Sequence, residues 1–97
     1  MSTFQTFHAV DDAVVHPAEV IAFFVDRFAF PLLITFLSKD SREARFTLGT
    51  YANPDDYLKR AERIVKCLRL PLTVSLTYRM VGGLVADSKL IVKYTGQ

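Results

Sequence analysis

The sequence predicts an α+β fold, with two helices on one face of an antiparallel sheet of four to five strands. Two segments have the apolar spacing of amphipathic helices, and each of them begins with a proline. The segments around them are rich in β-branched, aromatic and alternating apolar residues, as strands are. The connections are short and polar, so we expect the 97 residues to form a single domain over residues 1–97.

The two predicted helices have clear end signals. The first opens at His16-Pro17, since proline is favoured at the first helical position, and it ends near Ala29, before Pro31. The second begins at Asn53-Pro54-Asp55-Asp56, where the asparagine caps the helix and the two acids oppose its dipole. It is expected to end near Arg69, before the next proline.

The predicted strands follow one another through polar turns or glycines. Residues 30–38 and 43–51 form an expected hairpin around the turn Lys39–Arg42, and Gly82-Gly83 turns the chain near its end. The expected strands cover residues 3–10, 30–38, 43–51, 72–80 and 89–94. The order is therefore β-α-β-β-α-β-β, and its first six elements match the ferredoxin-like split βαβ plan. That plan serves many functions and decides none of them.

Composition excludes several classes of protein. Hydrophobic residues make up 51% and charged residues 23% of the chain, as in globular domains. The longest apolar stretch, Val20–Leu37, is interrupted by charges and a proline, so we expect no membrane span. The first residues lack the basic and apolar regions of a signal peptide. A single cysteine, Cys67, excludes an internal disulfide. Together these observations predict a soluble protein of a reducing cytoplasm.

The candidate catalytic residues form no recognisable arrangement. His8 and His16 do not have the spacing of metal ligands, and Asp11-Asp12 has no second acid or base linked to it by spacing. No sequence motif surrounds Cys67, and Gly82-Gly83 connects two strands instead of forming a phosphate loop. We therefore expect no enzymatic activity, no metal and no cofactor.

Charge is distributed unevenly, and this favours oriented binding to a charged partner. Residues 1–40 carry five acids and two bases, whereas residues 41–97 carry five acids and ten bases. The second predicted helix has a basic stripe of Lys59, Arg63 and Lys66. One alternative function is therefore a small RNA- or DNA-binding module. The basic stripe is also explained without any partner, as the solvated side of an amphipathic helix. We find no RNP1 signature, and residues 72–80 present threonine, serine and arginine outward, so direct nucleic-acid binding is not expected.

The first predicted helix carries an acidic face opposite its core stripe. Glu19 and Asp26 are seven residues apart, which places them on one side, about 10 Å apart along the axis. This is close to three base steps of B-DNA at about 3.4 Å per step. Phe23 lies between the two acids, and an aromatic residue among acids suits a protein-binding patch. A solvated helix face with one surface aromatic residue is the alternative.

The opening Thr3-Phe4-Gln5-Thr6-Phe7-His8-Ala9-Val10-Asp11-Asp12, the Pro17–Phe28 helix and the chain length resemble a small anti-CRISPR protein of the type I-F class. The resemblance covers the whole chain but includes no diagnostic motif. It implies an inhibitor, encoded by a phage or another mobile element, that acts in the cytoplasm of the infected bacterial host. Such an inhibitor would bind the type I-F surveillance ribonucleoprotein and block its binding of target double-stranded DNA.

The mode of action implied by this resemblance is local DNA mimicry. Acidic side chains would occupy the basic DNA-entry channel near the large and tail subunits of the complex. On this basis we expect a monomer whose partner-binding residues are Asp11, Asp12, Glu19, Phe23, Asp26, Asp55, Asp56 and Glu62. The net charge of +2 departs from the strongly acidic composition of most DNA mimics. Mimicry would therefore have to be confined to one surface.

Overall fold

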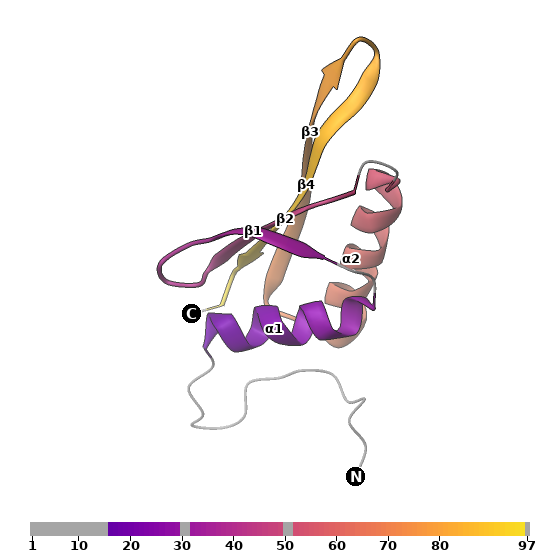
Figure 1. Cartoon of the computed structure of the whole chain (residues 1–97). Helices are drawn as coiled ribbons and strands as arrows, with labels where there is room; N and C mark the ends of the chain where they lie inside the picture. The colour runs from indigo at the N-terminus through magenta and orange to yellow at the C-terminus, as the bar shows by residue number, and fades with distance from the viewer. Residues whose placement is uncertain (1–15, 30–31, 50–51, 97) are drawn as a thin grey trace.

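The computed structural model describes residues 16–29, 32–49 and 52–96 (Figure 1). The predicted strand at residues 3–10 lies outside this part of the chain. The described elements are α1 (Pro17–Phe28), β1 (Leu33–Leu37), β2 (Glu43–Thr47), α2 (Pro54–Leu68), β3 (Leu72–Val81) and β4 (Leu84–Tyr94). The predicted α+β class, with an antiparallel sheet and two helices, is confirmed.

Both helices begin and end where the sequence places them, to within a residue. Each has proline in its first turn. The side chain of Asn53 accepts hydrogen bonds from the backbone N–H groups of Asp55 and Asp56, so the predicted cap of α2 is present. Each helix is followed by a residue in the left-handed region, Ala29 at φ 70° and Arg69 at φ 54°. This conformation commonly ends a helix.

The sheet has the strand order β1-β2-β4-β3, and every neighbouring pair is antiparallel. Strands β2 and β3 both run antiparallel to β4, so they are parallel to each other with β4 between them. The segment β2-α2-β3 is therefore a split βαβ unit of the ferredoxin-like kind. The last strand of the chain thus occupies a central position in the sheet.

The C-terminal hairpin is longer than predicted. Strand β4 begins at Leu84, directly after a two-residue turn in which Gly82 and Gly83 have φ angles of 57° and 80°. Positive φ at both positions is the requirement of a tight hairpin turn. The prediction began this strand at Lys89, whereas in the structure the strand continues through Asp87, which has a φ of 53°. The extra pairs form an arm that projects beyond the rest of the molecule (Figure 1).

The core lies between the helices and one face of the sheet. Phe24 and Phe28 of α1 are fully buried, with ring centroids 5.7 Å apart. The sheet contributes alternate residues of β2 and β4, which the register places side by side: Ala44 opposite Val92, and Phe46 opposite Leu90. Because both helices pack on this face, no described helix covers the opposite face of the sheet.

Candidate functional site

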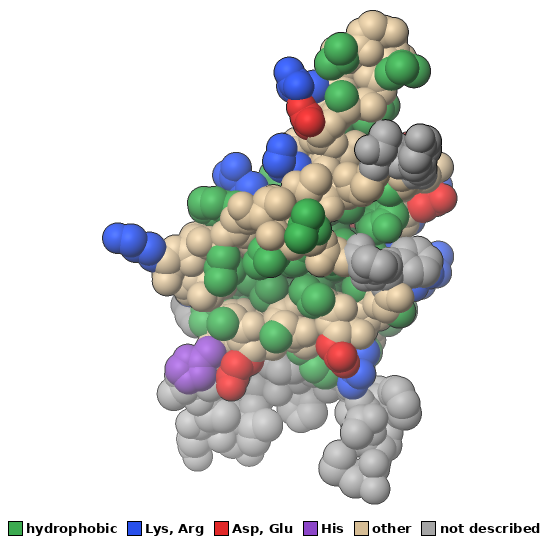
Figure 2. Space-filling view, viewed as in Figure 1, with side chains coloured by type: hydrophobic (Ala, Val, Ile, Leu, Met, Phe, Trp, Pro, Cys, Tyr) green, Lys and Arg blue, Asp and Glu red, His purple; other side chains and the backbone are tan. Residues whose placement is uncertain are grey.

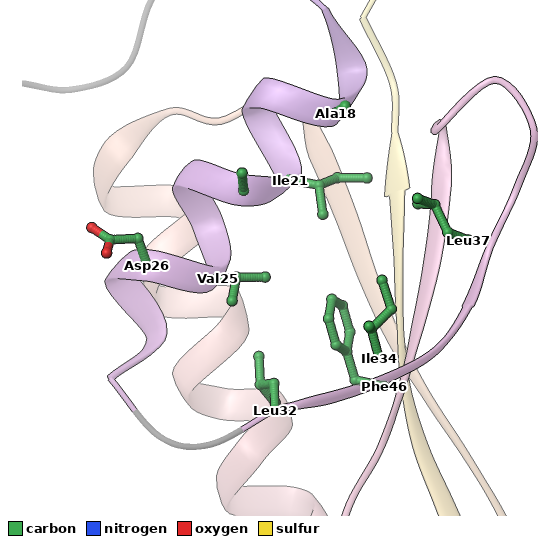
Figure 3. Close-up of a pocket in the computed structure, with 9 residues that line it drawn as sticks. Ala18, Ile21, Val25, Asp26, Leu32, Ile34, Leu37 and Phe46 are labelled. Carbon is green, nitrogen blue, oxygen red and sulfur yellow. The ribbon is translucent and has the colours of Figure 1, made fainter.

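An apolar groove lies between α1 and the β1 edge of the sheet (Figure 3). It has a volume of about 480 Å³. Its lining is almost entirely apolar and comes from α1, β1, β2 and the segment before β1: Ala18, Ile21, Ala22, Val25, Asp26, Leu32, Ile34, Leu37 and Phe46. Figure 2 shows these elements with hydrophobic side chains exposed between them. An exposed apolar depression of this kind is typical of a binding surface.

The groove is open because β1 is an edge strand whose apolar residues are not covered. All five of its residues are exposed, and Ile34 and Leu37 on the groove side are 48% and 49% exposed. Their register partners on β2, Phe46 and Ala44, are buried. The helices therefore cover the core side of β2 but leave the same side of β1 accessible.

Two carboxylates lie on α1 beside this groove. Asp26 lines it, although its carboxylate points away from the apolar side chains (Figure 3). Glu19 lies two turns earlier on the same helix and is exposed. The predicted acidic face of α1 is therefore accessible, and the structure places it at the rim of an apolar surface.

Phe23 and Asp26 both contact Arg27. The guanidinium carbon of Arg27 lies 4.6 Å from the centroid of the Phe23 ring, and its Nη1 atom lies 3.2 Å from Oδ2 of Asp26. Phe23 is half-buried and packs against the core. The face of α1 thus combines two acids with one base, and its aromatic residue is partly covered.

The other predicted acids are placed elsewhere. Asp55 and Asp56 lie in the first turn of α2, and Glu62 is exposed further along that helix. Asp56 shares a shallow depression with three bases, Lys59, Arg60 and Arg63. None of the α2 acids lines the groove beside α1, and Asp56 lies among bases instead. Asp11 and Asp12 lie outside the described residues.

One carboxyl group has a shifted pKa. The Ser38 hydroxyl and then the backbone N–H of Arg42 donate to Asp40, and these hydrogen bonds hold its pKa below its ordinary value. Both bonds close the turn between β1 and β2, so they have a structural role.

Among the residues that the structure describes, there is neither a group of side chains placed to hold a metal ion nor a helix able to span a membrane. Over residues 16–29, 32–49 and 52–96, no three histidine, cysteine or acidic side chains are grouped so that they could hold a metal ion. Cys67 is exposed on α2. Neither described helix is long and apolar enough to cross a membrane.

Sequence reasoning missed the apolar residues of the groove. The continuous apolar run at residues 30–38 predicted one strand of a hairpin, and no binding role was assigned to it. A run that is apolar on both faces fits a buried central strand, but the structure places it at an edge. The apolar run was therefore visible in the sequence. Whether it forms a buried strand or an exposed surface depended on the strand order.

Comparisons of the chain with protein-family models, with curated proteins and with solved structures give no match.

Proposed function

We propose that this protein is an anti-CRISPR inhibitor that binds the type I-F surveillance complex and blocks its binding of target double-stranded DNA. It acts in the cytoplasm of the infected bacterial host, as a monomer. The proposal rests on the resemblance of the N-terminal segment and α1 to this class of inhibitor. The observation that supports it in the structure is the exposed pair Glu19 and Asp26 on α1, of which Asp26 lines an apolar groove.

In this proposal the two carboxylates attract the protein to a basic channel and align it with the cationic side chains there. Glu19 and Asp26 are about 10 Å apart along the helix axis, close to the separation of three phosphate steps. An exposed ion pair contributes only about 0–1 kcal/mol, so two pairs do not hold a complex together. They act chiefly by steering the encounter and fixing the orientation.

The groove supplies the apolar contact that the acids lack. Ile34 and Leu37 are each about half exposed, and covering apolar surface contributes about 25 cal/mol per Å². A standard interface takes about 800 Å² from each partner, which is about one-eighth of the 6739 Å² surface of this chain. The groove together with the exposed face of α1 forms the centre of the proposed interface.

The α2 acids are secondary in this proposal. Asp55, Asp56 and Glu62 share their helix with Lys59, Arg63 and Lys66, so the field there is mixed. In the proposed complex the basic stripe of α2 faces away from the basic channel. The acids of α1 therefore contribute more to inhibition than those of α2.

The test compares two variants with the same change in charge. Glu19→Gln with Asp26→Asn neutralises the α1 pair, and Asp55→Asn with Glu62→Gln neutralises two acids of α2. Two ion pairs of about 0.5–1 kcal/mol each predict a fivefold to thirtyfold loss of affinity for the α1 variant. The α2 variant should lose less. Both variants should keep the wild-type circular dichroism spectrum.

The measurements are co-migration with a type I-F surveillance complex on gel filtration and displacement of a target duplex from that complex. If the wild-type chain neither co-migrates nor displaces DNA, the proposal is wrong. If it does both and the α1 variant inhibits as well as wild type, Glu19 and Asp26 do not belong to the interface.

A further inference from the structure

The face of the sheet opposite the helices carries polar and basic side chains on β2, β3 and β4, and neither described helix covers it. Strands β2, β3 and β4 point alternate residues toward it, and the register aligns these residues in rows across the sheet. The central row consists of Arg45, Ile91 and Ser75. It is flanked on one side by the row of Thr47, Lys89 and Thr77, and on the other by the row of Glu43, Lys93 and Thr73. These nine residues are four with hydroxyl groups, three cations, the single acid Glu43 and the apolar Ile91 at the centre.

Three cations are arranged at regular intervals on this face. Lys89 and Lys93 lie four residues apart on β4, about 13 Å along the strand. Arg45 is the register partner of Ile91, midway between them on the neighbouring strand, so its Cα lies about 8 Å from the Cα of each lysine. Within the described residues neither lysine forms a salt bridge, whereas Arg45 pairs with Glu43 at 2.7 Å.

An aromatic side chain lies at the β1 side of the same face. Phe36 is 44% exposed and is the register partner of Arg45, whose guanidinium carbon lies 4.8 Å from the ring centroid. The nearby hydroxyls of Thr35 and Thr47 are hydrogen-bonded to each other at 3.1 Å. Aromatic rings and guanidinium planes are the groups on which unpaired bases stack.

We propose that this open sheet face binds single-stranded nucleic acid. Lys89, Lys93 and Arg45 contact phosphates, and the Phe36–Arg45 pair provides the stacking surface for a base. Separated cations beside an aromatic side chain on an open sheet suit a flexible strand whose bases are accessible. The expectation against nucleic-acid binding rested on the missing RNP1 signature and on the outward residues of 72–80, and it did not consider the lysines of the neighbouring strand β4. This site is independent of the proposed inhibitor surface on α1.

The test measures fluorescence anisotropy of labelled single-stranded DNA and RNA oligonucleotides of about 15 nucleotides titrated with the full chain. Three phosphate contacts predict a slope of about −2 for log affinity against log salt, since each contact on a single strand contributes about −0.7. Raising the salt from about 50 to about 200 mM should therefore weaken binding about twentyfold.

Matched variants distinguish binding by this sheet face from binding by the basic stripe of α2. Lys89→Gln with Lys93→Gln should reduce the salt effect to about threefold, because one contact remains. Lys59→Gln with Lys66→Gln makes the same change in charge on α2 and should leave the slope unchanged. Phe36→Ala should weaken binding about fivefold or more without changing the slope. Circular dichroism of each variant establishes that it is folded.

Either of two results overturns the proposal. The first is that the wild-type chain binds no oligonucleotide at low salt. The second is that the α2 double variant reduces the slope as much as the sheet variant or more, since binding would then follow overall charge or the α2 surface. Failure of this test leaves the inhibitor proposal unaffected, because the assay contains no surveillance complex.

Discussion

Phe46 and Ile34 give the sharpest test of how the groove is built, because they are register partners with different burial. Both side chains line the groove, but Phe46 is 2% exposed and Ile34 is 48% exposed. We expect Phe46→Ala to lower the free energy of unfolding by about 3–5 kcal/mol, the usual cost of truncating a buried phenylalanine. A domain of this size has about 5–15 kcal/mol in total, so this loss is a large fraction of the stability and brings a domain at the low end of that range close to unfolding.

Ile34→Ala should lower the free energy of unfolding much less than Phe46→Ala does. Fully burying an isoleucine side chain contributes about 1.5–3 kcal/mol, and about half of that is available at Ile34, so we expect a loss of about 1 kcal/mol. The assay is urea unfolding followed by circular dichroism, since the chain has no tryptophan. The slope of free energy against urea must agree among the three proteins for the values to be comparable.

Equal losses for the two variants would refute this reasoning. They would mean that β1 is covered in solution, and that the groove is not an open surface. A small loss for Ile34→Ala, combined with weaker binding to the surveillance complex, would instead connect the groove to the proposed interface.

Two further predictions concern the ends of elements. Asn53→Ala removes the side chain that accepts a hydrogen bond from the backbone N–H of Asp55 at 3.0 Å. It should lower the free energy of unfolding by about 1 kcal/mol, which corresponds to about 4–8 °C in melting temperature. An unchanged melting temperature would show that this cap contributes nothing. Asp40→Asn should remove a contribution to stability that depends on pH, since hydrogen bonds from Ser38 and then from the backbone of Arg42 hold the pKa of Asp40 below its ordinary value of 3.8. Because the pKa of Asp40 is lower in the folded state than in the unfolded state, the contribution is fully present when the pH is above the ordinary pKa. It is lost as the pH falls through the lowered folded-state pKa. Urea unfolding of wild type and variant at a series of pH values should show their difference vanish in acid, and a difference that is independent of pH would contradict this assignment.

Local signals predicted the helices well and the strands less well. The two prolines, Asn53 and the acids after it determine helix starts through contacts within one turn, and the structure has both helices at the predicted places. The last strand was predicted from Lys89, but it begins at Leu84 and continues through Asp87, which has a positive φ. A strand with an irregularity continues through backbone pairing, which a side-chain pattern does not record.

The sequence by itself determined the class of fold, the helix boundaries and the acidic face of α1, because each of these follows from neighbours along the chain. The tertiary structure alone decided the strand order, and with it the surfaces that matter. Placing residues 33–37 at an edge turned an apolar run into an exposed groove. Placing β4 between β2 and β3 brought Lys89 and Lys93 beside Arg45 and Phe36 on one open face. Pairing between distant segments depends on hydrogen bonds and packing across the whole sheet, which no short stretch of sequence contains.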